Sequence, residues 1–186
     1  MADDGSMLYL ARNFRLMNNR LLFILFCLIS MVVSAQDLID GTYDFQTDSA
    51  KKYTLFIPSS YDENQPQELM LALHPLNTNR WDAHSWCDTL STFADANQLL
   101  LVCPDGGPDG AIDDPIDTAF TSFLLDEVEK NYNVNSEQVY VIGFSWGGKT
   151  VYTYGLTHAD RFEGFLVVGA AVVSSEVSPI AGLAQN

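Results

Sequence analysis

Residues 139–147, Val-Tyr-Val-Ile-Gly-Phe-Ser-Trp-Gly, decide the fold of this chain. An apolar run is followed by the pattern G-x-S-x-G, with Gly143, Ser145 and Gly147 at the defining positions, and residues 147–156 then favour a helix. This arrangement is typical of a nucleophile elbow, a strained turn that holds a serine hydroxyl above a sheet. The glycines are needed because strand and helix pack without room for a Cβ atom. The sequence therefore predicts that Ser145 is a nucleophile.

The same segment also satisfies a second pattern. Residues 143–150, Gly-Phe-Ser-Trp-Gly-Gly-Lys-Thr, match the phosphate-binding P-loop G-x-x-x-x-G-K-[ST]. A P-loop NTPase also needs an acidic residue for Mg²⁺ after a nearby strand. The next apolar run instead ends in Ala170 and Ala171. A P-loop NTPase is therefore the weaker interpretation, and Lys149 is expected to be an ordinary residue of the helix.

Apolar runs and helical patterns alternate along the rest of the chain. Near-continuous apolar runs are typical of strands that are buried on both faces of a parallel sheet. They occupy residues 69–73, 99–103, 139–144 and 165–169. Helical spacing covers residues 81–97, and Asp114-Pro115 places an N-cap before a helix. Residues 42–46 and 53–58 resemble the strands of a hairpin. The sequence predicts an α/β fold: a mostly parallel sheet, an N-terminal antiparallel hairpin, and helices on both faces.

Several segments resemble the secreted α/β-hydrolase esterases, and among these the polyhydroxybutyrate-depolymerase and feruloyl-esterase-like proteins. The segments are Tyr-Thr-Leu-Phe-Ile-Pro58, Leu-Ala-Leu-His74, Cys-Pro-Asp105-Gly and Val-Tyr-Val-Ile-Gly-Phe-Ser145-Trp-Gly-Gly. The resemblance runs from about Tyr53 to Ala171. It implies an α/β-hydrolase fold and a serine hydrolase that acts on esters, of plant-polysaccharide side chains or of polyesters. The chain departs from the group at Pro75, where glycine is usual, and it lacks the Trp-rich segment after Pro-Asp-Gly.

The resemblance also implies an oxyanion hole. In this fold one backbone donor lies just after the first buried strand, and the other is the N–H of the residue after the nucleophile, here Trp146. Pro75 has no N–H, so Leu76 is the expected first donor and Asn77 is the alternative. His74 is expected to brace this loop rather than to act as the catalytic base.

The rest of a catalytic triad is not recognisable. The triad of this fold follows the order Ser, Asp or Glu, His. After Ser145 the one histidine is His158, which helical geometry of about 1.5 Å per residue places roughly 20 Å from the nucleophile. Among the later acids, only Glu176 is expected after the carboxyl end of a strand. We therefore expect the triad acid and histidine to be absent from these residues, the last strands of the sheet to be missing, and this fragment to be nearly inactive.

Residues 1–35 are interpreted as an N-terminal extension plus a signal peptide, with the signal at residues 17–35. The apolar run Leu21–Val33 follows Arg20 and precedes Ser34-Ala35, which predicts cleavage after Ala35 and a secreted or periplasmic protein. The run is shorter than the roughly 20 residues of a membrane span. An uncleaved anchor is the alternative, and Met1 and Met17 both stay open as the start. Residues 36–186 are then a partial α/β-hydrolase domain.

Charge and composition narrow the range of partners. The chain has 24 Asp and Glu against 9 Lys and Arg, a formal net charge of −15. Binding to nucleic acid or an anionic membrane needs clustered basic residues, so the expected partner is a small or polymeric ester. No cofactor and no metal are predicted, because Asp105–Gly110 lacks the ligand positions of a calcium loop.

Cys87 and Cys103 are the cysteines that follow the signal peptide. Helix and strand geometry place them at similar heights, so a disulfide and a pair of buried free thiols are both open. Trp146 is placed to touch substrate, whereas Trp81, Trp86 and Phe144 are expected to pack in the core. The leading hypothesis is a secreted carboxylic-ester hydrolase that works by acyl transfer. The alternatives are a non-catalytic or carbohydrate-binding hydrolase-like protein, a peptidase on the same fold, and the P-loop NTPase.

Overall fold

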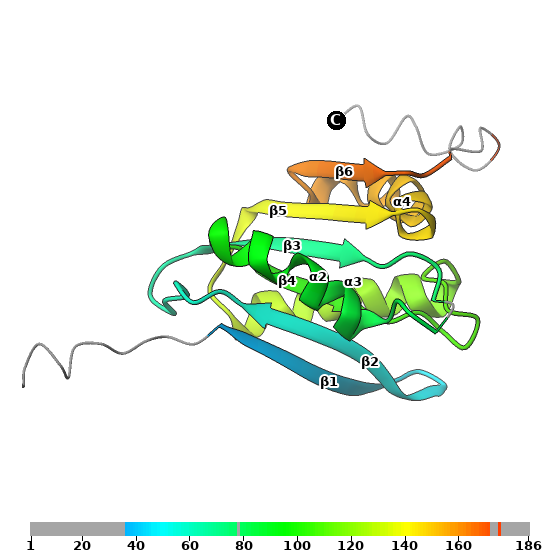
Figure 1. The fold of residues 1–186 in the computed structure, drawn as a ribbon, viewed down its shortest axis with the longest axis horizontal. Helices are drawn as coiled ribbons and strands as arrows, with labels where there is room; N and C mark the ends of the chain where they lie inside the picture. The colour runs from blue at the N-terminus through cyan, green and yellow to red at the C-terminus, as the bar shows by residue number, and fades with distance from the viewer. Residues whose placement is uncertain (1–35, 78, 172–174, 176–186) are drawn as a thin grey trace, which may run out of the picture. The chain divides into compact units, whose positions relative to one another are not determined.

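The computed structural model describes residues 36–77, 79–171 and 175. Within these residues the strands form one six-stranded sheet in the order β1-β2-β4-β3-β5-β6 (Figure 1). The strands are β1 Asp37–Phe45, β2 Asp48–Ile57, β3 Gln67–Leu73, β4 Leu100–Pro104, β5 Val134–Phe144 and β6 Gly164–Val168. The helices are α2 Ala83–Ala96, α3 Pro115–Asn131, α4 Trp146–Thr150, the π-helix η1 Val151–Gly155 and the 3₁₀ turn η2 Ala159–Arg161. The predicted signal peptide, the N-terminal extension and Glu176 lie outside the described residues.

The sheet is antiparallel where β2 pairs with its neighbours and parallel among the other strands. Strands β1 and β2 form the predicted hairpin, with a two-residue turn in which Gln46 has a φ of 55°. Strand β2 also pairs antiparallel with β4. The pairs β3–β4, β3–β5 and β5–β6 are parallel. The predicted mostly parallel sheet with an N-terminal hairpin is confirmed.

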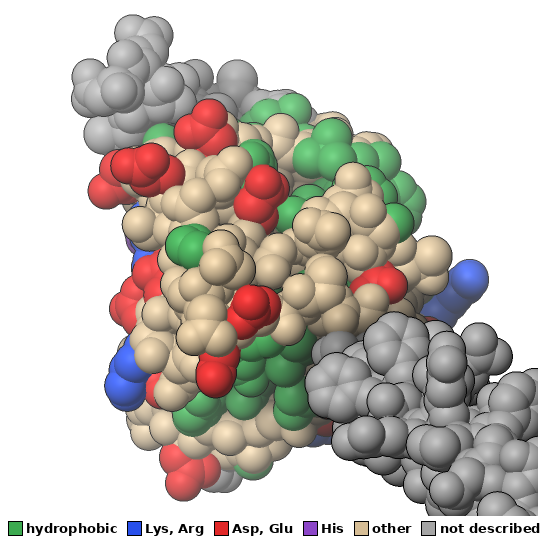
Figure 2. Space-filling view, turned by 90° about the vertical axis from the view of Figure 1, so that its left-hand side faces the viewer, with side chains coloured by type: hydrophobic (Ala, Val, Ile, Leu, Met, Phe, Trp, Pro, Cys, Tyr) green, Lys and Arg blue, Asp and Glu red, His purple; other side chains and the backbone are tan. Residues whose placement is uncertain are grey.

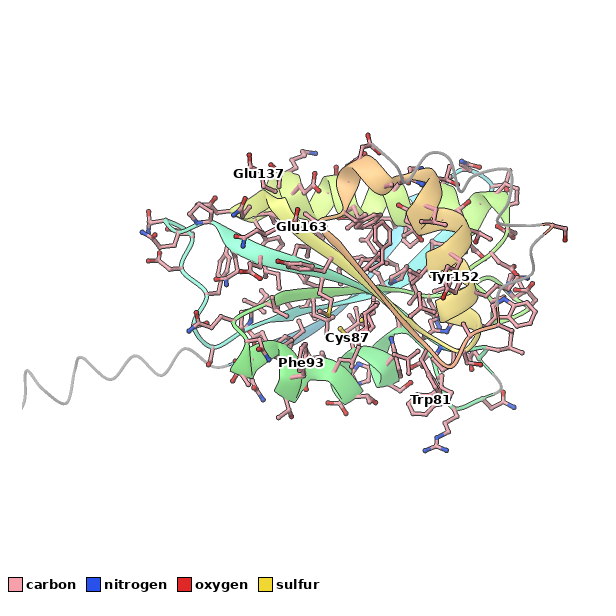
Figure 3. All side chains as sticks on the ribbon, turned by 90° about the horizontal axis from the view of Figure 1, so that it is seen from above. Trp81, Cys87, Phe93, Glu137, Tyr152 and Glu163 are labelled. Carbon is pink, nitrogen blue, oxygen red and sulfur yellow. The ribbon has the colours of Figure 1, made fainter. Side chains whose placement is uncertain are left out.

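Helices cover both faces of this sheet, and side chains of the central strands alternate between two apolar clusters. Leu69, Leu71 and Leu73 of β3 pack in the cluster that includes Phe120 of α3 and Tyr154 of η1. Met70 and Ala72 point the other way, into the cluster with the α2 side chains. Figure 3 shows Cys87 and Phe93 of α2 on one side of the sheet and Tyr152 of η1 on the other. Burial on both faces explains why the strands appear in the sequence as continuous apolar runs.

Strand β5 begins earlier than the apolar pattern predicts. It starts at Val134, and residues 135–138 are polar. The register with β3 is irregular here, because Gln67 pairs with Val134 but Leu69 pairs with Val139. An irregular pairing of this kind depends on backbone hydrogen bonds at the sheet end rather than on apolar side chains. The hydrophobic pattern of the sequence therefore gave no sign of it.

Strand β6 is the outermost strand on its side within the described residues. Its side chains Phe165, Leu166 and Val168 are 40%, 53% and 42% exposed.

Figure 2 looks onto the end of the sheet where β3, β5 and β6 begin, and acidic side chains are scattered over this face without a cluster of basic ones. None of the described helices has the length and hydropathy of a membrane span.

Cys87 of α2 and Cys103 of β4 lie in the same apolar cluster, between α2 and the sheet. Both are buried, and both are free thiols in the structure. The Cys87 thiol donates weakly to the carbonyl oxygens of Thr54, at 3.7 Å, and Leu101, at 3.8 Å. Burial raises the pKa of the Cys103 thiol well above its ordinary value, and interaction with Cys87 raises it further. The alternative of buried free thiols describes this state, and a disulfide between them stays a prediction.

A buried ion pair connects the hairpin to α3. The Lys51 ammonium of β2 binds the Asp117 carboxylate in the first turn of α3, and their side chains are 3% and 1% exposed. Asp117 also accepts a hydrogen bond from the Gly107 N–H at 3.2 Å. Burial raises the pKa of Asp117, and the contact with Lys51 only partly offsets this increase. The pair therefore joins β2, α3 and the loop after β4.

We expect Asp117→Ala to lower the free energy of unfolding by about 3–5 kcal/mol, because it leaves the Lys51 ammonium buried without this carboxylate. Urea denaturation followed by circular dichroism measures the change. Lys130→Ala is the matched control. It removes an ion pair to Glu127 in which the Lys130 side chain is 69% exposed, and it should cost less than about 1 kcal/mol. Equal, small effects of the two substitutions would contradict the prediction.

Candidate active site

Ser145 lies at the sharp turn between β5 and α4. Strand β5 ends at Phe144 and α4 begins at Trp146, so the serine is the only residue between them. Its φ of 55° and ψ of −113° are unusual for a residue with a side chain. The turn is held from two sides, because the Ser145 N–H donates to the Val168 carbonyl of β6 at 2.8 Å and the Lys149 N–H donates to the Ser145 carbonyl at 3.0 Å. The serine is exposed to solvent.

The glycines on either side of Ser145 lie against other backbone atoms. A Cβ atom on Gly147 would be 2.1 Å from the Leu73 carbonyl oxygen, and one on Gly143 would be 2.2 Å from the Gly147 carbonyl oxygen. Neither position has space for a side chain, because a backbone atom cannot move aside as a flexible side chain can. The end of β3 therefore packs directly against the beginning of α4.

Two backbone donors are open at this end of the sheet. Leu73 pairs with Gly143 in the β3–β5 register, and Leu76 and Trp146 each follow that pair by three residues. Among the described residues, neither the Leu76 N–H nor the Trp146 N–H has an acceptor. The Asn77 N–H, in contrast, donates to the Gly110 carbonyl at 2.8 Å. The structure thus engages Asn77, the alternative donor, and leaves Leu76 and Trp146 available to an anionic oxygen.

His74 holds two loops together at the base of this site. It is buried, its Nε2 accepts the Gly106 N–H at 3.0 Å, and its Nδ1 lies 2.6 Å from the Pro75 carbonyl oxygen. The Nδ1–H tautomer satisfies both contacts, because it donates to Pro75 and accepts from Gly106. Both ring nitrogens are therefore engaged, and His74 has the bracing position that the sequence predicts.

The other two histidines also lie away from the serine. His158 ends the helix and is bonded through Nδ1 to the Tyr154 carbonyl oxygen at 2.9 Å. His84 Nδ1 lies 2.9 Å from the Asp40 carboxylate. All three histidines of the chain are among the described residues, and none of them forms a hydrogen bond with Ser145. None of the three histidines is therefore placed in this structure as a base for Ser145.

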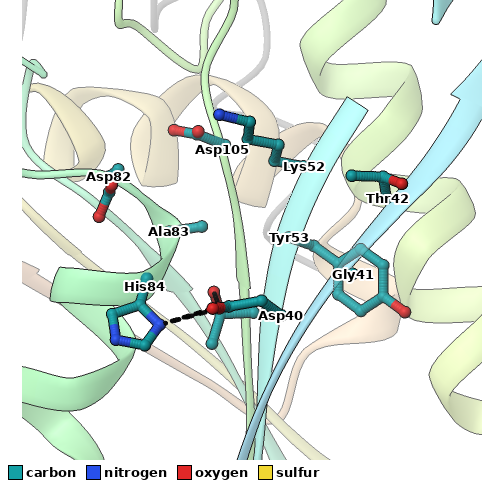
Figure 4. Close-up of a pocket in the computed structure, with 10 residues that line it drawn as sticks. Asp40, Gly41, Thr42, Lys52, Tyr53, Asp82, Ala83, His84 and Asp105 are labelled. Atoms are coloured by element: carbon teal, nitrogen blue, oxygen red, sulfur yellow. Dashed lines mark hydrogen bonds and ion pairs between the residues drawn. The ribbon is translucent and has the colours of Figure 1, made fainter. Parts of the chain in front are cut away.

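The His84–Asp40 pair borders a cavity of about 370 Å³ between β1, β2 and the beginning of α2 (Figure 4). Asp82 and Asp105 also line it, whereas Ser145 does not. The hydrogen bond with Asp40 raises the pKa of His84. Burial opposes ionisation of Asp40, but hydrogen bonds from His84 and Thr54 outweigh it and lower the pKa of that carboxyl. The pair links β1 to α2 and does not belong to the serine site.

Residues 146–150 form helix α4 and not a phosphate-binding loop. The Lys149 N–H is used in the helical bond to the Ser145 carbonyl, and the Lys149 ammonium lies 4.6 Å from the centroid of the Trp146 ring. A P-loop needs a free loop of N–H groups in front of its helix. The geometry around Ser145 therefore does not support the P-loop interpretation.

The sequence missed one residue of this site, Asp113. Its carboxylate accepts a hydrogen bond from the Trp146 indole at 2.8 Å, across 33 residues of sequence. No local pattern indicates such a contact. Among the other aromatic residues, Trp86 is 7% exposed and packs between Trp81 and Phe144, at centroid distances of 5.7 and 6.2 Å. This agrees with the expected core packing of Trp86, whereas Phe144 is 39% exposed and is not buried as expected.

No protein-family model matches this chain, but individual esterases are similar to it in sequence. A probable feruloyl esterase C of Aspergillus niger is 28% identical over 132 residues, which are 68% of this chain and 48% of that protein. A bifunctional acetylxylan esterase/xylanase of Neocallimastix patriciarum is 30% identical over 130 residues, which are 66% of this chain and 18% of that protein. The chain spans about half the length of the feruloyl esterases that it matches.

Solved structures show the same fold. The fluorophosphonate-binding serine hydrolase FphF of Staphylococcus aureus superposes with a TM-score of 0.64 at 17% identity, over 75% of this chain and 59% of that one. A ferulic acid esterase superposes with a TM-score of 0.61 at 19% identity, over 81% of this chain and 67% of that one. The chain has an α/β-hydrolase fold, as the resemblance implies, and its relatives in sequence are esterases.

We expect Gly147→Ala to lower the free energy of unfolding by about 3 kcal/mol or more, because the added methyl group meets backbone carbonyls that cannot yield. Gly107→Ala is the matched control, since the nearest atom to its Cβ would be 3.4 Å away and the change should stay within about 1 kcal/mol. Urea denaturation compares the two variants. If the Gly147 variant were as stable as the control, the close approach of β3 and α4 would be wrong.

We expect the pKa of His84 to lie above its ordinary value of about 6.5 and to fall in Asp40→Asn, since the carboxylate favours the charged imidazole. The link between β1 and α2 is then fully present below the ordinary histidine pKa and is lost as pH rises through the raised pKa of His84. Proton NMR titration of the imidazole resonances measures this. Asp88→Asn, which acts only through space, should give a smaller decrease. A His84 pKa unaffected by Asp40→Asn would refute the pairing.

Proposed function

We propose that this protein is a secreted carboxylic-ester hydrolase that works by acyl transfer through Ser145. The observation that carries the proposal is an exposed serine in a strained turn, at the same sheet end as the open N–H groups of Leu76 and Trp146. An α/β-hydrolase fold and sequence relatives that are esterases support the same chemistry.

The proposed reaction has two half-steps. The Ser145 hydroxyl attacks the ester carbonyl carbon, and the developing oxyanion accepts hydrogen bonds from the Leu76 and Trp146 N–H groups. The tetrahedral intermediate expels the alcohol and leaves an acyl group on Ser145. Water then attacks the acyl carbonyl in the same environment, which releases the acid and regenerates the serine.

Ser145 needs a base to remove its proton. His74, His84 and His158 are each bonded elsewhere, so we propose that the histidine and its acidic partner come from polypeptide outside these 186 residues. The match to only about half of each feruloyl esterase supports this. The chain by itself should then react about 10²–10⁴-fold more slowly than a complete protein, the contribution that general-base catalysis usually makes.

The proposed substrate class is an acyl ester carried on a plant polysaccharide. The names of the relatives describe feruloyl and acetylxylan esterases, and secretion, predicted from residues 1–35, would bring the protein to such a polymer. A polyester is the second candidate substrate. The net charge of −15 gives no support to a nucleic acid or an anionic membrane as a partner.

A fluorophosphonate probe tests the nucleophile. We expect the protein extended by its reading frame beyond Asn186 to be labelled covalently at Ser145, and labelling to be lost in Ser145→Ala. Ser136→Ala, at an exposed serine of β5, should retain it. The 186-residue chain should be labelled far more slowly. Labelling that survives in Ser145→Ala would disprove the assignment, and cleavage of peptide anilides without cleavage of nitrophenyl esters would favour a peptidase.

A further inference from the structure

The loop between β4 and α3 lies between the two sides of the proposed oxyanion hole. Its first half contacts the loop after β3. The Gly106 N–H donates to His74 Nε2 at 3.0 Å, and the Gly110 carbonyl accepts the Asn77 N–H at 2.8 Å. These bonds fix the backbone on both sides of Leu76, the first of the two expected donors.

The second half of the same loop contacts α4, the helix that follows Ser145. The Ile112 carbonyl accepts a hydrogen bond from the Thr150 hydroxyl at 2.8 Å. One residue later, the Asp113 carboxylate accepts the indole N–H of Trp146 at 2.8 Å. The loop is thus bonded to both backbone segments that carry an expected oxyanion donor.

The Trp146 side chain is held on two sides although it lies at the surface. It is 37% exposed. Its ring edge is bonded to Asp113, and the Lys149 ammonium lies over the ring at 4.6 Å from the centroid. A cation over an indole face is attracted to the ring. These two contacts hold the indole in one orientation at the surface, while the backbone at the beginning of α4 sets the direction of the Trp146 N–H.

We propose that Asp113 is a positioning residue, which holds the Trp146 indole in one orientation so that it can position the ester at the proposed Ser145 site. The inference rests on the proposed function of Ser145 and Trp146. Asp113 is exposed, so its removal leaves no cavity in the core. The Ile112–Thr150 bond would still attach the loop to α4, which separates loss of positioning from loss of the loop.

The acceptor atom, and not the charge, is the essential feature of Asp113. An indole N–H needs one oxygen acceptor at about 2.9 Å, and an asparagine side chain also provides one. Asp113→Asn should therefore preserve the contact, whereas Asp113→Ala should abolish it. Trp146→Phe removes the donor from the other side and retains an aromatic ring next to the serine.

The contact is tested first without reference to catalysis. ¹⁵N-tryptophan labelling of the full-length protein gives one indole N–H signal for each tryptophan, and the signal that Trp146→Phe removes is that of Trp146. We expect Asp113→Ala to shift the Trp146 indole signal and to speed its exchange with water, and Asp113→Asn to preserve slow exchange. Asp88→Ala, at an exposed position of α2, is the control and should change neither. An indole signal unaffected by Asp113→Ala would overturn the proposal.

Kinetics on a nitrophenyl ester then test the positioning role. We expect Asp113→Ala and Trp146→Phe to lower kcat by similar factors, between about 10- and 100-fold, the effect of misplacing a substrate-positioning group by up to about 1 Å. KM should change little, the double variant should lose no more than either single one, and Asp113→Asn should restore kcat. A normal kcat in Asp113→Ala, with the indole signal shifted, would overturn the positioning role and leave the proposed function intact. Failure of the proposed function itself would appear separately, as fluorophosphonate labelling retained in Ser145→Ala.

Discussion

The structure depends on one close backbone contact, in which Gly147 lies against the carbonyl groups at the end of β3. A Cβ atom at this position would be 2.1 Å from the Leu73 oxygen and 2.6 Å from the His74 oxygen. Because no side chain separates them, the beginning of α4 and the end of β3 lie together. This contact brings the two backbone segments with open N–H groups to the same end of the sheet as the serine. It also explains the strained backbone of Ser145, since the chain must reverse from strand to helix within one residue.

Around this contact, the loops after β3, β4 and β5 form one hydrogen-bonded unit. His74 joins the first loop to the second through Gly106, and Asp113 joins the second loop to the elbow through Trp146. The buried pair of Lys51 and Asp117 is also bonded to the second loop, because Asp117 accepts the Gly107 N–H. A polar group that is buried with its partner is costly to separate from it. The buried Lys51–Asp117 pair therefore holds this loop more firmly than the exposed Asp113–Trp146 bond does.

The described residues contain one part of the proposed hydrolase site and not another. Ser145, the proposed nucleophile, and the N–H groups of Leu76 and Trp146 lie at one end of the sheet, whereas the three histidines are bonded to other partners. The positions of Ser145 and of the two N–H groups are set by the backbone of the turn and of the neighbouring loop, and not by a histidine. Strand β6, whose apolar side chains are exposed, pairs with β5, the strand that ends just before Ser145. The Ser145 N–H donates to the Val168 carbonyl at the end of β6.

The sequence by itself determined most of the strands and helices and the sharp turn at Ser145. Apolar runs identify strands buried on both faces, and the pattern around Ser145 identifies the turn, because both signals depend on neighbouring residues. The capping of α3 by Asp114 is equally local, since its side chain accepts the Asp117 N–H at 2.7 Å. Only the tertiary structure showed that the Asn77 N–H is bonded to the Gly110 carbonyl, and only it showed the contact of Asp113 with Trp146. These bonds join loops that are far apart in sequence. Their partners are set by how the strands are ordered in the sheet, which no local pattern of residues records.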